Sequence, residues 1–209
     1  MGRADTVSHS NDHTPLSRSE LPDDTLALAR FLIGKLVVRD LPEGVVSGRI
    51  VETEAYVVGD AAGHGYRGMT SRNRSLFLEP GHAYVYVAYG ISYMLNVSSD
   101  VPGIGTGVLI RALEPLEGIA IMRLNRGIER LRDLARGPGR LATALRIDRS
   151  LDGLDLCRQG PLWLGHGEDD EPDEIGQSTR IGISRDASRL LRFYVRGSPF
   201  VSGPRSLNE

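Results

Sequence analysis

Two glutamates and a group of tyrosines are the residues of this sequence best suited to chemistry. Glu52, Glu54 and Tyr56 alternate along a strand-like stretch, so their side chains would share one face of a β-strand. Tyr84 and Tyr86 are in phase along a second such stretch. A carboxylate can act as a general base, and tyrosine rings can stack on a flat aromatic ligand. This combination favours an enzyme that takes a base out of a nucleic-acid stack and cuts its bond to the sugar.

The spacing of the two glutamates leaves two other interpretations open. On a regular strand their carboxyls would stand about 7 Å apart, which overlaps the separation found in inverting glycoside hydrolases. A sugar hydrolase that uses Glu52 and Glu54 is therefore an alternative, although it predicts stacking tryptophans and Trp163 is the only tryptophan. In the second interpretation, both glutamates form ion pairs with arginines on the surface of the sheet.

Tyr89 and Gly90 stand where the second strand pattern would turn back as a hairpin. An aromatic residue at such a turn is normally exposed, which suits a side chain that enters the gap left by an extruded nucleotide. His64 lies between two glycines and has no second ligand at metal spacing. We therefore expect it to form hydrogen bonds with a nucleotide rather than to bind zinc.

The charge of the chain does not by itself favour DNA binding, because the formal net charge is -2. The distribution answers part of this objection: six of the seven residues 168–174 are acidic, and residues 111–149 contain nine arginines against five acids. A phosphate contact surface needs only local positive charge. A non-catalytic nucleic-acid-binding module is a further alternative, but it gives no reason for a carboxylate among the aromatic residues.

Lys35 is the only lysine of the chain. An enzyme that forms a Schiff base needs an amine in its pocket, and Lys35 is far in sequence from every candidate pocket residue. The sequence therefore favours attack by water over attack by a lysine.

Six motifs, in order along residues 26–202, resemble the alkyladenine (3-methyladenine) DNA glycosylase family. They are Ile-Val-Glu-Thr-Glu-Ala-Tyr (50–56), Ser-Arg-Asn (71–73), Tyr-Val-Tyr-Val-Ala-Tyr-Gly (84–90), Asn-Val-Ser-Ser (96–99), Leu-Ile-Arg-Ala-Leu-Glu-Pro-Leu-Glu-Gly (109–118) and Leu-Arg-Phe-Tyr-Val-Arg-Gly-Ser-Pro (191–199). The resemblance implies a monofunctional DNA repair enzyme. Such an enzyme flips alkylated or deaminated purines out of double-stranded DNA, hydrolyses the N-glycosidic bond with an activated water and leaves an abasic site.

The resemblance also assigns roles to individual residues. Glu54 would deprotonate the water, and Arg111 would hold Glu54 and the water in place. Four residues would bind the flipped base, and among them Asn96 would oppose the exocyclic amino group of guanine; the four are Tyr56, His64, Tyr86 and Asn96. Contact with DNA is expected from Tyr89, Leu109, Arg72 and Arg74, although the last two also fit solvent-exposed charges. No metal or other cofactor is implied.

Two departures from the family pattern lie near the expected pocket. The loop between Tyr56 and His64 is about one residue shorter than usual, and Ser71 replaces a proline before Arg-Asn. They bear on the shape of the pocket, and hence on the range of damaged bases, more than on the activity.

These residues have to be positioned by a mixed set of elements. Strand patterns occur at 36–39, 45–55, 83–88, 91–98, 108–113 and 190–195, and a helix capped by Asp23 or Asp24 extends to about residue 33. Further helices are expected from Pro115 to about 124, at 128–135 and at 140–147. The pattern predicts a single α+β domain with a curved, mainly antiparallel sheet flanked by helices. A protruding, DNA-intercalating β-hairpin completes the prediction.

The remaining expectations concern boundaries and location. We expect a disordered tail at residues 1–19 and the glycosylase domain at residues 20–205. The chain lacks an apolar run of membrane-spanning length and an N-terminal signal peptide, and it contains one cysteine, Cys157. We therefore expect a cytoplasmic monomer, associated with the nucleoid in a bacterium, whose partner is duplex DNA with a damaged base.

Overall fold

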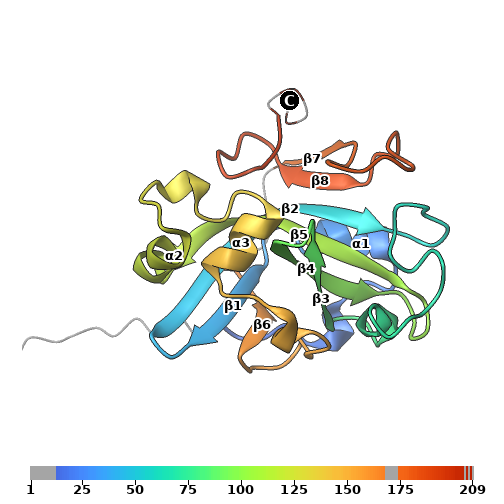
Figure 1. The fold of residues 1–209 in the computed structure, drawn as a ribbon, viewed down its shortest axis with the longest axis horizontal. Helices are drawn as coiled ribbons and strands as arrows, with labels where there is room; N and C mark the ends of the chain where they lie inside the picture. Colours follow the sequence, from blue (N-terminus) through green and yellow to red (C-terminus); the bar gives the residue numbers. More distant parts are fainter. Residues whose placement is uncertain (1–12, 168–173, 205, 207, 209) are drawn as a thin grey trace, which may run out of the picture.

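In the computed structural model, which describes residues 13–167, 174–204, 206 and 208, an antiparallel sheet curls around the centre of the molecule (Figure 1). Six strands follow the order β3-β4-β5-β2-β1-β6, while β8 pairs with β2 and β7 pairs with β8. The strands are β1 (Leu36–Leu41), β2 (Gly44–Tyr56), β3 (Ala83–Ala88), β4 (Ser92–Ser99), β5 (Thr106–Glu117), β6 (Leu162–Gly165), β7 (Ile175–Ser178) and β8 (Arg192–Val195). The predicted α+β class and the curved antiparallel sheet are confirmed.

Three α-helices and four 3₁₀ helices pack around the sheet in the described part of the chain. They are α1 (Thr25–Phe31), α2 (Ile119–Arg126) and α3 (Pro138–Ala144), together with 3₁₀ helices at Arg18–Glu20, Arg74–Phe77, Leu131–Asp133 and Arg149–Leu151. The predicted cap of α1 is confirmed, because the Asp24 carboxylate accepts hydrogen bonds from the N–H groups of Leu26 and Ala27 at 2.9 and 3.0 Å. None of the described helices is long and apolar enough to cross a membrane.

Strand β2 determines where the candidate residues lie. Its first half pairs with β1, its second half pairs with β8, and β5 runs along nearly its whole length. The register between β2 and β5 shifts on both sides of Glu52. Such irregularities bend a strand and increase its twist. The bend brings the end of β2, with Glu52 and Glu54, against both β5 and β8.

Two of the helix predictions are wrong. Pro115 lies inside β5 opposite Gly48, and α2 begins only at Ile119, after Gly118 turns the chain with a φ of 67°. Proline is tolerated in β5 because β4 pairs only with its first residues, so no neighbour on that side needs the missing N–H. The segment 128–135 contains a single 3₁₀ turn, since the Ala135 carbonyl accepts a hydrogen bond from Leu113 of β5 instead of continuing a helix.

The N-terminal boundary also lies earlier than predicted. Residues 13–19 are packed against β6: Leu16 is fully buried, and its N–H donates to the Leu164 carbonyl at 2.9 Å. The Trp163 indole N–H donates to the His13 carbonyl at 2.9 Å. The polar composition of residues 1–19 predicts a disordered tail and does not reveal the burial of Leu16. Residues 1–12 and the acidic residues 168–173 lie outside the described part of the chain.

Candidate active site

A cavity of about 460 Å³ opens where the β3–β4 hairpin meets the end of β2, the start of β5 and two loops. One loop follows β2 and carries His64, and the other, residues 181–183, follows β7. Eight of the predicted site residues line it: Tyr56, His64, Arg72, Tyr86, Tyr89, Asn96, Leu109 and Arg111. Its volume lies in the range of small-molecule binding sites, which accommodate a ligand the size of a nucleobase.

Glu54 lies directly beneath this cavity rather than in its lining, and its side chain is fully buried. Three residues that do line the cavity donate hydrogen bonds or charge to the carboxylate. The Ile181 N–H donates to Oε1 at 2.7 Å, Arg111 Nη1 stands 3.2 Å from the same oxygen, and the Tyr56 hydroxyl donates to Oε2 at 3.1 Å. Glu54 is thus held by donors from β2, from β5 and from the loop after β7.

The two glutamates lie in opposite electrostatic environments. Burial raises the pKa of Glu54, and the Arg111 guanidinium and the Ile181 N–H offset this only in part. Burial would also raise the pKa of Glu52, but Arg111 and Arg192 together lower it below the ordinary value. Glu54 is therefore the carboxylate that takes up a proton more readily, as a general base must.

Glu52 is fully occupied by structural partners. Its Oε1 is 2.8 Å from Arg111 Nε and 2.7 Å from Arg192 Nε, and its Oε2 accepts the Ser202 N–H at 2.6 Å. The side chain is as fully buried as that of Glu54, but of these three partners only Arg111 lines the cavity. The glycoside hydrolase alternative, which needs Glu52 as an accessible partner of Glu54, is therefore not supported. Both glutamates do pair with arginine, but in the interior rather than on the surface of the sheet.

Three aromatic rings form one wall of the cavity. The rings of Tyr84 and Tyr86 stack with their centroids 5.4 Å apart, and the His64 ring packs edge-on against Tyr86 at 4.3 Å. His64 Nδ1 and the Tyr84 hydroxyl are joined by a hydrogen bond of 2.8 Å. Partial burial, and then the charge of Arg72, lower the pKa of His64. The histidine is consequently neutral near pH 7, and the wall suits a flat ring.

Asn96 and Leu109 complete the lining beside this wall. Asn96 is nearly buried, and its Nδ2 donates to the Tyr84 carbonyl at 3.1 Å. An amide nitrogen carries two hydrogens, so the second is available to a group inside the cavity. Leu109 is buried as well, which limits its expected DNA contact to whatever enters the cavity. The roles of both residues stay predictions.

The tip of the β3–β4 hairpin is exposed and carries two large apolar side chains. Tyr89 and Ile91 are 85 % and 86 % exposed, and the Ile91 N–H donates to the Ala88 carbonyl across the turn. Tyr89 and Gly90 have φ values of 52° and 72°, and positive φ at both central residues is the pattern of type I′ hairpin turns. Positive φ is unusual for a bulky residue. Tyr89 is thus kept at the mouth of the cavity in spite of a backbone cost.

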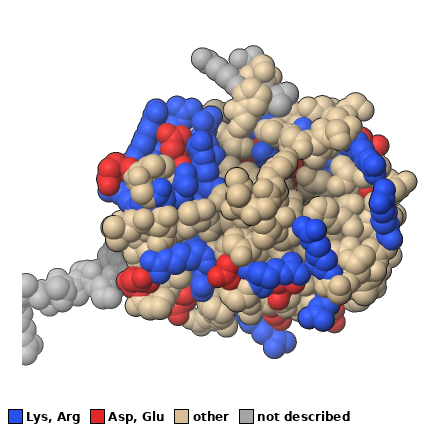
Figure 2. Space-filling model, viewed as in Figure 1, with Lys and Arg blue, Asp and Glu red and all other residues tan. Residues whose placement is uncertain are grey.

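Arg72 and Arg74 differ in their position relative to the cavity. Arg72 lines the cavity and donates to the Val87 carbonyl at 3.3 Å, whereas Arg74 is exposed at the start of a 3₁₀ helix and does not line it. On the face viewed in Figure 2, basic side chains interspersed with acidic ones lie around a largely uncharged central area. This arrangement is compatible with the predicted phosphate contacts of Arg72 and Arg74.

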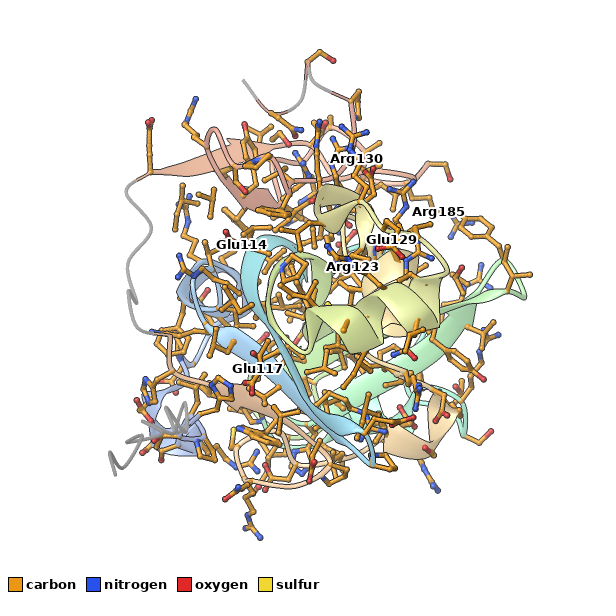
Figure 3. The ribbon with its side chains drawn as sticks, turned by 90° about the vertical axis from the view of Figure 1, so that its left-hand side faces the viewer. Glu114, Glu117, Arg123, Glu129, Arg130 and Arg185 are labelled. Atoms are coloured by element: carbon orange, nitrogen blue, oxygen red, sulfur yellow. The ribbon has the colours of Figure 1, made fainter. Side chains whose placement is uncertain are left out.

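The arginine-rich segment around α2 has mixed charge instead. Arg123 lies beside Glu129 at 3.5 Å, and Arg130 is 3.5 Å from Asp133 (Figure 3). The same view shows Glu114 and Glu117 on this flank of the molecule. Much of the positive charge that the sequence placed in residues 111–149 is therefore neutralised locally.

Several site residues could not be recognised from the sequence. Arg180 and Asp60 form a buried ion pair behind Tyr56, and the backbone N–H of Ile181 contacts Glu54. A second, smaller cavity beside His64 is lined in part by Arg67 and Arg185. These residues come from loops without a helix or strand pattern, and a backbone donor leaves no signal in residue type.

Comparison with known proteins agrees with this geometry. The family model for methylpurine-DNA glycosylase matches residues 19–199. The chain belongs to the methylpurine-DNA glycosylase family. A protein of Mesorhizobium japonicum, provisionally named 3-methyladenine DNA glycosylase, is 83% identical over 209 residues, the whole of both chains. A protein of the same name from Paraburkholderia phytofirmans is 54% identical over 193 residues, which cover 92% of this chain and 90% of the relative.

The similarity extends to a third relative. A protein from Methanoculleus marisnigri with the same provisional name is 46% identical over 182 residues, which cover 86% of this chain and 94% of the relative. The family match covers every element that forms the cavity, from β2 to β8. The resemblance inferred from six motifs is confirmed at the level of the family.

Proposed function

We propose that this protein removes alkylated purines from double-stranded DNA by hydrolysis of the N-glycosidic bond, leaving an abasic site. The observation that carries the proposal is a buried carboxylate, Glu54, beneath an aromatic cavity of nucleobase size. Three cavity-lining residues hold that carboxylate from different elements. A binding module has no use for such a group, because a carboxylate weakens phosphate binding.

The reaction needs little more than a placed water and an extruded base. Alkylation at a ring nitrogen makes the purine a cationic leaving group, so the bond from the sugar carbon to the base breaks without an added acid. A water oxygen forms the new bond to that carbon, and Glu54 Oε2 accepts the proton of the water. Among the described residues, Oε2 receives one hydrogen bond, from Tyr56, and a carboxylate oxygen has a further lone pair for the water.

Arg111 and Tyr56 both stay protonated and so remain donors to Glu54. Burial by itself would lower the pKa of Arg111, but the charges of Glu54 and Glu52 outweigh it and raise the pKa, so the guanidinium stays protonated. Burial, and then the charge of Glu54, raise the pKa of the Tyr56 hydroxyl. Tyr56 therefore remains a hydrogen-bond donor and does not compete with Glu54 for the proton of the water.

The lining favours cationic purines over undamaged bases. Tyrosine faces attract cations, and the second N–H of Asn96 opposes the exocyclic amino group of guanine, which is also a donor. Neutral lesions need protonation of the leaving base, and the lowered pKa of His64 leaves little of its protonated form near pH 7. We expect cationic lesions to be released faster than hypoxanthine or ethenoadenine.

The experiment that tests the proposal measures base release from duplexes that each carry a single 3-methyladenine, hypoxanthine, ethenoadenine or uracil. Release of 3-methyladenine with an abasic product, and no release of uracil, is expected. Borohydride should trap no protein–DNA adduct, because Lys35 is buried outside the cavity lining with its ammonium over the Phe31 ring. Failure to release any purine lesion, or a trapped adduct, would overturn the proposal.

A further inference from the structure

A buried ion pair lies behind the cavity wall, between Asp60 in the loop after β2 and Arg180 in the loop after β7. Both side chains are almost completely buried. Two guanidinium nitrogens of Arg180 contact the two carboxylate oxygens of Asp60, the second contact measuring 2.9 Å. Arg180 Nη1 also donates to the Ala55 carbonyl at 3.0 Å. Neither residue lines the cavity, so the pair acts on the site only through its neighbours.

Those neighbours are three separate parts of the site. The Arg180 guanidinium stands over the Tyr56 ring, 4.6 Å from its centroid. The next residue, Ile181, donates its N–H to Glu54 at 2.7 Å. On the other side of the pair, Asp60 Oδ1 accepts the Ala62 N–H at 3.1 Å, which fixes the loop that leads to His64.

We propose that Arg180, held by Asp60, is a positioning residue that aims the Ile181 N–H at Glu54 and fixes the Tyr56 ring beside it. The inference rests on the proposed function, because it concerns the orientation of Glu54 as the general base in that reaction. Fold stability alone is a weak explanation for this pair, since apolar residues of similar volume often stabilise an interior equally well. Its contacts instead connect two loops that meet at the catalytic carboxylate.

The charge state of Glu54 gives a readout of this positioning. Besides the Ile181 N–H, the groups that face Glu54 are Arg111 from β5, Glu52 and Tyr56 from β2, Tyr86 from β3 and Arg180 itself. Burial raises the pKa of Glu54, and the Ile181 N–H is one of the contacts that lower it. A displaced N–H would therefore leave Glu54 harder to ionise, and activity at low pH would fall first.

The test compares Arg180→Met, Arg180→Lys and Asp60→Asn with the unmodified protein. Single-turnover release of 3-methyladenine from a defined duplex is measured from acid to alkaline pH. We expect Arg180→Met and Asp60→Asn to move the acid limb to higher pH by about one unit. The rate of 3-methyladenine release near neutral pH should fall roughly 10- to 100-fold, because Glu54 is no longer correctly oriented. Arg180→Lys keeps the charge and should recover part of the rate.

Arg18→Met is the matched control. Arg18 forms a partly buried ion pair with Asp155 at 2.8 Å and does not line the cavity, so this variant should keep the pH profile of the unmodified protein. Profiles of Arg180→Met and Asp60→Asn that superimpose on the control would overturn the inference. If thermal melting shows that Arg180→Met does not fold, the pH profile of Asp60→Asn alone tests the positioning role of Arg180. If the unmodified protein releases no damaged base, it is the proposed function that fails instead.

Discussion

At the scale of single residues, Glu52 and Glu54 lie only two positions apart in β2 but have different contacts. Glu52 forms ion pairs with Arg111 and Arg192 and accepts a hydrogen bond from Ser202. Glu54 shares Arg111 and accepts a hydrogen bond from Tyr56, which lines the cavity. The difference comes from Arg192, which contacts Glu52 and not Glu54. Arg111 bridges the two carboxylates, so Glu52 also orients the arginine that the proposed general base, Glu54, shares.

Glu52→Gln is expected to destabilise the fold. Loss of the carboxylate leaves Arg111 and Arg192 buried beside a neutral amide, and breaking a buried ion pair typically costs about 3–5 kcal/mol. Because the folded pKa of Glu52 is lowered, its contribution is present above the unfolded pKa and is lost as the pH falls through the folded value. Urea unfolding at neutral and at acid pH measures both effects.

Glu54→Gln is the matched control for stability. The folded pKa of Glu54 is raised, so its ionised form costs stability at neutral pH and an amide removes that cost. The free energy of unfolding should therefore not fall in this variant. A larger loss of stability in Glu54→Gln than in Glu52→Gln would mean that the two roles are reversed.

At the scale of elements, the strand pattern was readable because it depends on neighbours in sequence. Alternation predicted β3 at its observed bounds and placed Glu54 and Tyr56 on one face. The helix at Pro115 was wrong because proline fits both the first turn of a helix and an unpaired strand position. Which of the two applies depends on whether a neighbouring strand needs its N–H.

The β3–β4 hairpin supports a prediction of its own. Tyr89→Ala should weaken base extrusion more than bond cleavage, because extrusion costs a few kcal/mol and an inserted ring offsets part of that cost. Lesion affinity and the flipped fraction of ethenoadenine, read by its fluorescence, should both decrease. The deficit should shrink when the lesion faces a mismatch, since extrusion is then easier.

Leu124→Ala provides the control for this change. Leu124 on α2 is 81 % exposed and does not line the cavity, so its loss should affect neither affinity nor fluorescence. Tyr89→Ala should also leave the unfolding free energy nearly unchanged, because an exposed ring contributes little packing. A loss of several kcal/mol, as for a buried aromatic, would contradict the role of Tyr89 at the DNA surface.

At the scale of the whole molecule, the site depends on residues that are distant in sequence. Two of the contacts to Glu54, the ion pair with Arg111 and the hydrogen bond from Tyr56, involve side chains that the sequence singles out. The third contact comes from the backbone N–H of Ile181, which the sequence cannot reveal. The pair of Asp60 and Arg180 joins loops 120 residues apart, and neither loop has a periodic pattern. The motifs therefore predict the site residues, whereas the contacts that hold these residues in place are visible only in three dimensions.

The most direct test of the account is single-turnover release of 3-methyladenine by Glu54→Gln. The amide keeps the size of the side chain but cannot accept a proton from the water, so the rate should fall roughly 100- to 10,000-fold. Binding of the damaged duplex should remain. A rate close to that of the unmodified protein, with the variant folded and bound to the same duplex, would contradict the assignment of Glu54 as the general base.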